Sequence, residues 1–163
     1  MSEKDRTLQT LDWIRARTHD LLKDFPEDKL HHQPSKTDNH VVWTLGHLAM
    51  TDEWLHSMID PKFKSALPES YGKLFGYQTK CDGDAKKYPP YAEVKKHFDA
   101  THSALIKAAK TAGDQTLSAS LKEKSGGFAE DGFDALLKGV WHEGWHAGQI
   151  AGIRKTLGLK PVF

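Results

Sequence analysis

The sequence contains a single cysteine, Cys81, and no apolar run approaching the roughly 20 residues needed to cross a bilayer. One cysteine excludes an intrachain disulfide, and its Gly- and Asp-rich surroundings, KCDGD, predict a loop rather than a catalytic thiol. The N-terminal residues MSEKDRTLQT lack the apolar core and cleavage site of a secretory signal. We therefore expect a cytoplasmic protein that does not insert into a membrane.

An excess of charge of either sign is also missing. The 23 Lys and Arg residues nearly balance the 22 Asp and Glu residues, and the two signs are interspersed. This distribution argues against nucleic acid or an anionic membrane as a partner. No repeat or low-complexity tract is present, and 163 residues suit one domain. We expect a single domain spanning residues 1–163.

Four long segments have the three- and four-residue apolar spacing of amphipathic helices, and no segment predicts a strand. The expected helices run from about Glu3 to Phe25, from Asp38 or Asn39 to Ile59, from Tyr91 to about Ala112, and from about Asp131 to Leu157. Capping residues, prolines and Gly158 mark their ends. This pattern predicts an all-α protein built as a four-helix bundle.

Two of the connections are long. Residues 60–90 contain four prolines and several aromatic residues, too apolar for a free linker, and are expected to form a packed loop that covers one end of the bundle. Residues 113–130 are expected to contain a short helix around Leu117 to Lys124, followed by a glycine turn.

Two histidines, His142 and His146, stand four residues apart within the last expected helix. Residues at i and i+4 share one helix face, so both rings can reach one metal ion. Gln149 lies on the same otherwise apolar ridge, and polar groups on a core-facing ridge cost free energy unless they are paired. The pair therefore predicts either metal ligands or hydrogen-bonded core histidines.

His47 is the best candidate for a third ligand. Its neighbours at i−4, i+3 and i+7 are apolar, which places it on a core-facing ridge of the second helix. Alone, it is interpreted as a core histidine bonded to a backbone carbonyl, but a three-histidine site accounts for His47, His142 and His146 together. The other histidines are expected to be surface or capping residues, with His102 the least certain: His19, His31, His32, His40, His56, His97 and His102.

These motifs resemble the DinB-like superfamily, which includes the bacillithiol S-transferases. The resemblance rests on Gly46-His47-Leu48 and on His142-Glu-x-x-His146-Ala-Gly-Gln149-Ile, followed by Arg154 and Gly158. It implies an up-down-down-up four-helix bundle in which His47, His142 and His146 hold a divalent metal ion. It also implies that homodimers are common, but it does not fix the reaction.

The same letters match HExxH, the zinc-peptidase signature in which the Glu is the general base. The extended form of that signature requires Gly at position 149 and His at position 152, where this chain has Gln149 and Gly152. Glu143 lies about 100° around the helix from His142, toward a neighbouring helix. Peptidase chemistry is therefore disfavoured, and Glu143 and Gln149 remain only weak candidates for catalytic residues.

Three neutral imidazoles with an open coordination position suit Zn²⁺ or Ni²⁺ in a catalytic site. Such an ion can turn a low-molecular-weight thiol into a thiolate, the nucleophile for transfer to an electrophilic small molecule in detoxification or stress response. The apolar cavity is expected to be lined by aromatic residues of the 60–90 loop and by Trp43, Trp54, Trp141 or Trp145. A hydrolase that uses metal-bound hydroxide and a non-catalytic metal- or ligand-binding module stay open as alternatives.

Gly144, Gly148 and Gly152 recur every four residues and leave one strip of the last helix without side-chain bulk. Small residues permit the close approach of another helix. The strip is interpreted either as a contact with a helix of the same bundle, which is favoured, or as the seam of a homodimer.

Overall fold

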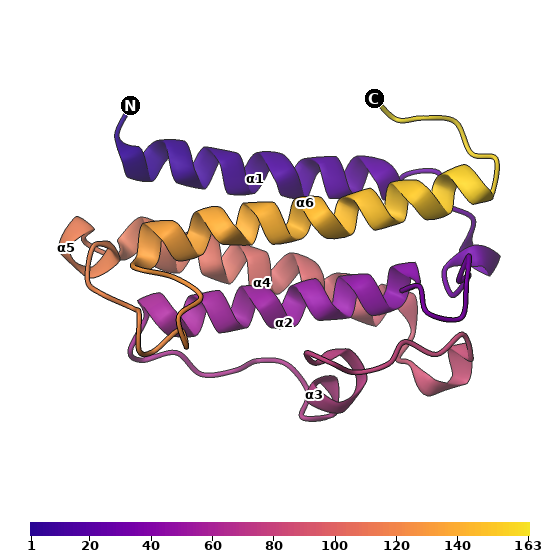
Figure 1. Cartoon of the computed structure of the whole chain (residues 1–163), viewed down its shortest axis with the longest axis horizontal. Coiled ribbons are helices and arrows are strands. Elements are labelled where there is room, and N and C mark those ends of the chain that lie inside the picture. The colour runs from indigo at the N-terminus through magenta and orange to yellow at the C-terminus, as the bar shows by residue number, and fades with distance from the viewer.

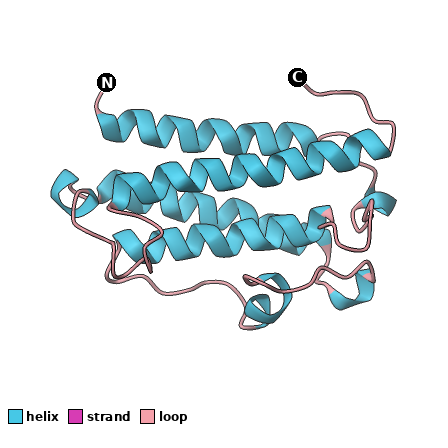
Figure 2. Ribbon diagram, viewed as in Figure 1, coloured by secondary structure: helices cyan, strands magenta, loops and turns pink.

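The computed structural model describes residues 1–163 and consists of helices joined by loops, with no strand (Figures 1 and 2). The four long helices are α1 (Glu3–Leu22), α2 (Val41–Ile59), α4 (Tyr91–Thr111) and α6 (Gly132–Thr156). The short helices are α3 (Ser70–Phe75), α5 (Asp114–Leu117) and two 3₁₀ turns at Glu27–Lys29 and Ala85–Lys87. The all-α class expected from the sequence is confirmed. None of these helices is both long enough and apolar enough to span a membrane.

The four long helices lie side by side along the length of the molecule (Figure 1). The main packed pairs are α2 with α4 and α1 with α6, and α2 also packs against α6. After α2 the chain returns along the outside of the bundle, so α4 begins at the same end of the molecule as α2 (Figure 1). Because α2 packs against α6, their seam brings together segments that are about a hundred residues apart in the sequence.

Two apolar clusters form the core, one toward each end of the bundle. The first includes Leu45, Phe75, Phe98 and Ile150, and the second includes Leu11, Leu55, Leu105 and Leu136. Burying a side chain of this size contributes roughly 1.5–3 kcal/mol. Along α1, α2 and α6, the buried charged residues Arg15, Asp52 and Glu143 fall between the two clusters.

Helix boundaries differ from the expected ones where local constraints decide them. Helix α1 ends at Leu22 rather than Phe25, because the residue before Pro26 is disfavoured in the helical conformation. Helix α2 begins after His40 rather than after Asp38 or Asn39, because the His40 Nδ1 accepts the Trp43 N–H at 3.0 Å. Burial lowers the pKa of His40 to about 4, so its ring is neutral and able to accept this bond.

The ends of α6 follow the capping signals in the sequence. The Asp131 carboxylate accepts the Asp134 N–H at 2.9 Å at the N-terminus. Beyond the C-terminus, Gly158 adopts a φ of 69°, the left-handed conformation expected of a terminating glycine. Its role as a C-terminal cap is confirmed.

Both long connections differ from expectation. Residues 60–90 run along the flank of α2 instead of covering one end of the bundle, because Tyr71 and Phe75 of α3 are buried against the core, with 1% and 0% exposure (Figure 1). The short helix in residues 113–130 is α5, Asp114–Leu117, rather than a helix around Leu117 to Lys124. The segment after α5 folds back on itself, and the Leu121 N–H donates to the Glu130 carbonyl at 2.8 Å.

Candidate metal centre

The three candidate ligands meet at the seam between α2 and α6. One nitrogen from each ring of His47, His142 and His146 lies within 4.8 Å of the others. The Nε2 atoms of His47 and His142 are 3.3 Å apart. Tetrahedral Zn–N bonds of about 2.0–2.1 Å place two ligand nitrogens about 3.4 Å apart, so this pair already has a suitable separation. His146 is buried, and the other two rings are half-buried.

Hydrogen bonds to the outer nitrogens orient two of the rings. His47 Nδ1 donates to the Phe75 carbonyl at 2.8 Å, and His146 Nδ1 donates to the Gln149 Oε1 at 2.9 Å. A ring that donates from Nδ1 in its neutral form carries its lone pair on Nε2. Both lone pairs are therefore free to face the shared space, the arrangement typical of metal-binding histidines.

The electrostatics of the cluster favour neutral rings. Burial lowers the pKa of His47, and burial reinforced by the neighbouring rings lowers the pKa of His142 to about 4 and of His146 to about 3. Metal binding requires deprotonated imidazoles, so these rings are ready for it at neutral pH. The Nδ1 of His142 is buried without a hydrogen-bond partner. A divalent cation in the shared space would balance the converging lone pairs, so the donor set fits a metal ion.

Trp43 forms one wall of the site. Its ring stacks on His47 with centroids 4.8 Å apart and planes 11° apart, and its Nε1 donates to the Thr79 Oγ1 at 3.2 Å. Trp43 thereby limits the orientations of the His47 ring. Trp141 and Trp145 do not form walls as expected, because they are surface residues with 60% and 59% exposure.

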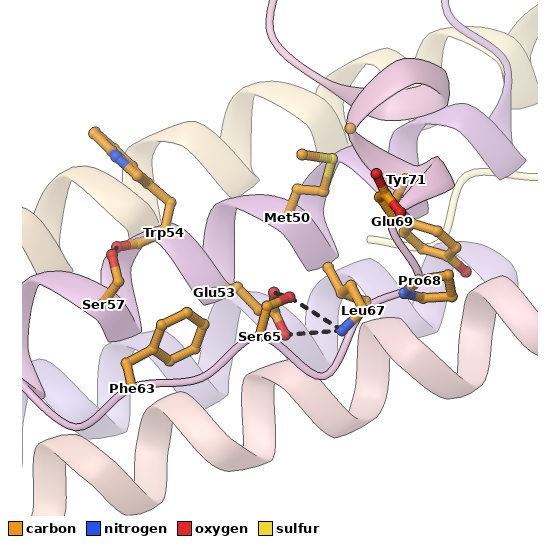
Figure 3. A pocket seen from close by; sticks show the side chains of 11 residues that line it. Met50, Glu53, Trp54, Ser57, Phe63, Ser65, Leu67, Pro68, Glu69 and Tyr71 are labelled. Carbon is orange, nitrogen blue, oxygen red and sulfur yellow. Dashed lines mark hydrogen bonds between the residues drawn. The ribbon is translucent and has the colours of Figure 1, made fainter.

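A pocket of about 280 Å³ opens between α2 and residues 63–72 (Figure 3). Met50, one turn beyond His47, and Trp54 contribute from α2. None of the three histidines lines this pocket, so the expectation that Trp54 lines the cavity of the metal site stays a prediction. Glu53 fixes the opposite wall, because its Oε1 accepts the backbone N–H of Ala66 at 2.7 Å and of Leu67 at 3.2 Å. The result is a partly apolar recess that begins at Met50, one turn along α2 from His47.

Glu143 points away from the histidine cluster and toward α1. Its Oε1 accepts from Arg15 Nε and from Thr18 Oγ1, each at 2.8 Å, and its Oε2 accepts from Arg15 Nη2 at 3.1 Å. Arg15 also donates to the Asp52 Oδ2 at 2.8 Å. The carboxylate is 3% exposed and fully engaged by these donors. Glu143 is therefore part of a buried ion network, and its placement does not suit a base for metal-bound water.

Arg15, Asp52 and the Phe75 carbonyl were not predicted from the sequence. Arg15 and Asp52 could have been noticed as charged residues on the apolar ridges of α1 and α2. No sequence signal marks Phe75, because its contribution is a backbone atom. Of the other histidines, His40 is a capping residue, in agreement with the expectation, whereas His102 is buried, at 6% exposure, and differs from it.

Gly46 gives a direct test of how α3 supports the centre. A Cβ added at Gly46 would lie 2.5 Å from the buried Phe75 ring. We expect Gly46→Ala to displace α3, to lower the free energy of unfolding by roughly 1–3 kcal/mol, and to weaken metal binding through loss of the bond from His47 to Phe75. Denaturant unfolding and metal titration measure the two effects. Gly72→Ala, where an added Cβ meets nothing within 4 Å, is the control, and wild-type behaviour of Gly46→Ala would contradict this role.

The chain also matches a known protein family over most of its length. A sequence model of the DinB superfamily matches residues 10–150, a span that contains the three histidines and most of the bundle. No curated protein matches the sequence closely enough to identify a relative. The resemblance noted from the sequence motifs is confirmed. The family match covers well over half of the chain, and the chain therefore belongs to the DinB superfamily.

Proposed function

We propose that the chain binds one divalent ion, Zn²⁺ or Ni²⁺, through His47, His142 and His146, and that it transfers a low-molecular-weight thiol to electrophilic small molecules. The observation that carries the proposal is the convergence of three neutral rings, two of them oriented by hydrogen bonds from Nδ1. We also propose a cytoplasmic role in detoxification or stress response. For the fold, we propose the up-down-down-up order of the four long helices, which the return of the chain along α2 supports (Figure 1).

Three protein ligands leave a position for an exogenous group, as in catalytic rather than structural zinc sites. A bound divalent ion would lower the pKa of a coordinated thiol and supply a thiolate at neutral pH. In the transfer, the sulfur forms a bond to the electrophilic carbon, and the leaving group departs with its electron pair. Phe75 and Gln149 orient the rings, and the recess beside Met50 and Trp54 is suited to an apolar part of the electrophile.

Hydrolysis is the less favoured alternative. A hydrolase that activates water gains about 10²- to 10⁴-fold from a positioned general base. The HExxH signature would assign the role of general base to Glu143. Its carboxylate, however, is held by Arg15 and Thr18 on the side of α6 that faces α1. A non-catalytic metal-binding module has the same ligand set and is separated from an enzyme by turnover alone.

Metal analysis of the purified protein followed by a panel of thiols tests the proposal. The panel pairs bacillithiol, mycothiol, glutathione and cysteine with a model electrophile, and the rate of conjugate formation is measured with and without a chelator. Chelator-sensitive conjugation that depends on one thiol supports a transferase. Thiol-independent hydrolysis supports the hydrolase, and stoichiometric metal without turnover supports the binding module.

Glu143→Gln separates thiol transfer from peptidase chemistry. We expect this variant to keep its metal ion and most of its thiol-dependent rate, because coordination itself deprotonates a thiol. Its free energy of unfolding should fall by about 1.5–3 kcal/mol, the usual contribution of a hydrogen bond to a charged group. Conjugation and peptide cleavage are measured for both proteins. Peptide cleavage by the wild type that disappears in Glu143→Gln would make the chain a peptidase.

A further inference from the structure

The oxygen atom of the Gln149 side chain accepts two hydrogen bonds. Its Oε1 accepts from His146 Nδ1 at 2.9 Å and from Asn39 Nδ2 at 3.4 Å. Asn39 immediately precedes His40, the residue that caps α2, so this contact joins the start of α2 to the C-terminal half of α6. The residue that orients the ligand His146 is therefore itself held by a third residue.

The hydrogen-bonding roles of these three groups are linked. A side-chain amide accepts at its oxygen and donates from its nitrogen, and a neutral imidazole has one donor nitrogen and one acceptor nitrogen. When Gln149 presents Oε1, His146 donates from Nδ1 and keeps its lone pair on Nε2, the nitrogen left free for an ion. When Gln149 presents Nε2 instead, His146 must accept at Nδ1, and its proton then occupies Nε2. Only the first arrangement suits metal binding.

The space beside Gln149 is open, so packing does not fix the orientation of its amide. A cavity of about 330 Å³ is lined by Thr37, Asn39, Gln149 and Gly152, among others. A Cβ added at Gly148 or Gly152 would meet no atom within 4 Å. The favoured interpretation of the glycine strip, a contact with a helix of the same bundle, is therefore wrong for these two glycines. What Gln149 presents to His146 depends on its hydrogen-bond partners.

We propose that Asn39 is a positioning residue for the metal centre: its Nδ2 donates to Gln149, which keeps the amide oxygen toward His146 and the lone pair of His146 on Nε2. This role rests on the proposed function, because it concerns a bound ion. Outer partners of metal-binding histidines fix the tautomer and the orientation of the ring. Here the same requirement extends one residue further, so position 39 must be able to donate a hydrogen bond.

Aspartate at position 39 separates this role from simple electrostatics, because the two effects have opposite signs. An added carboxylate near a divalent cation favours binding of the cation by Coulomb attraction. An ionised aspartate has the shape of asparagine but only accepts hydrogen bonds, so it turns the Gln149 Nε2 toward itself and toward His146. A metal affinity that falls in Asn39→Asp, despite the added negative charge, therefore indicates the loss of a donor.

Competition with a chromophoric chelator measures the dissociation constant for Zn²⁺. We expect Asn39→Asp to raise it about 10-fold or more, the usual effect of losing an outer partner. Thr37→Asp adds the same charge to the same cavity, at a side chain that bonds only to Ser35, and should keep or lower the wild-type value. A wild-type or tighter affinity in Asn39→Asp, or an equal loss in Thr37→Asp, would overturn the role of Asn39.

Gln149→Glu supplies a rescue that a purely structural role would not produce. A carboxylate at position 149 has only acceptor atoms, so His146 donates from Nδ1 whatever residue stands at position 39. We expect Asn39→Ala to raise the dissociation constant for Zn²⁺ severalfold when Gln149 is present, and to leave it unchanged when Gln149→Glu is present. An equal loss of affinity in both backgrounds would mean that Asn39 acts by packing alone, contrary to the proposal.

The tautomer of His146 is measured in the metal-free protein by long-range ¹H–¹⁵N correlation spectroscopy, with His146→Ala to identify its ring signals. We expect the Nδ1–H form in the wild type and the Nε2–H form in Asn39→Asp. Failure of the wild type to take up zinc would overturn the proposed function. An unchanged tautomer in Asn39→Asp, in a protein that does bind zinc, would overturn only the role of Asn39.

Discussion

His146→Ala is expected to leave the protein without stoichiometric metal. Three imidazoles converge at the centre, and His146 is the most buried of them and the one oriented by Gln149. Loss of an outer-shell partner typically costs 10- to 100-fold in metal affinity, and loss of a ligand itself should cost more. Two imidazoles on a half-buried surface then retain the ion poorly, so conjugation activity should disappear with it.

Elemental analysis after gel filtration measures the metal content, with circular dichroism to verify the helices. His32→Ala, at a histidine outside the cluster, is the matched control and should bind metal as the wild type does. His47→Ala and His142→Ala should resemble His146→Ala, since each removes one of the three nitrogens. Unchanged metal content in His146→Ala would rule out this site, and a loss in all four variants would point to non-specific effects.

Sequence periodicity was sufficient to predict the four long helices and to single out the three histidines as one candidate site. The spacing of His142 and His146 requires one shared face, and the apolar neighbours of His47 place it on a buried ridge. Both arguments use contacts that are local in the sequence. Bundle packing then needs only to set α2 beside α6 for the three rings to meet.

The support around the site could not be predicted in the same way, because it depends on distant segments. The Phe75 carbonyl reaches His47 only because α3 folds onto Gly46, whose missing side chain leaves room for the Phe75 ring. The exposure of Trp141 and Trp145 likewise depends on the position of α1, which leaves that side of α6 uncovered. An exposed and a buried tryptophan have the same local sequence signature, so periodicity could not distinguish these residues from Trp43.

Arg15→Met should lower the free energy of unfolding by about 3–5 kcal/mol, the usual cost of breaking a buried ion network by removing one partner. Arg15 donates to Asp52, Glu143 and the Phe98 carbonyl, and its guanidinium lies 3.6 Å from the centre of the Phe98 ring. Methionine fills much of the same volume but leaves two buried carboxylates without their cation. The defect is therefore electrostatic rather than a cavity.

The pH dependence of this loss identifies its cause. Burial already raises the pKa of Asp52, while Arg15 opposes the rise, so removing Arg15 raises that pKa further. A carboxyl whose folded pKa exceeds its unfolded value takes up a proton on folding, so its contribution to stability is present in acid and is lost as the pH rises through the folded pKa. Chemical unfolding at pH 5 and pH 8 should show the larger deficit in the free energy of unfolding of Arg15→Met, relative to the wild type, at pH 8.

The matched control, Arg15→Met/Asp52→Asn/Glu143→Gln, removes both charges and should show a deficit that does not change with pH. An equal deficit for Arg15→Met at both pH values would mean that packing on Phe98, rather than charge, explains why Arg15 is buried.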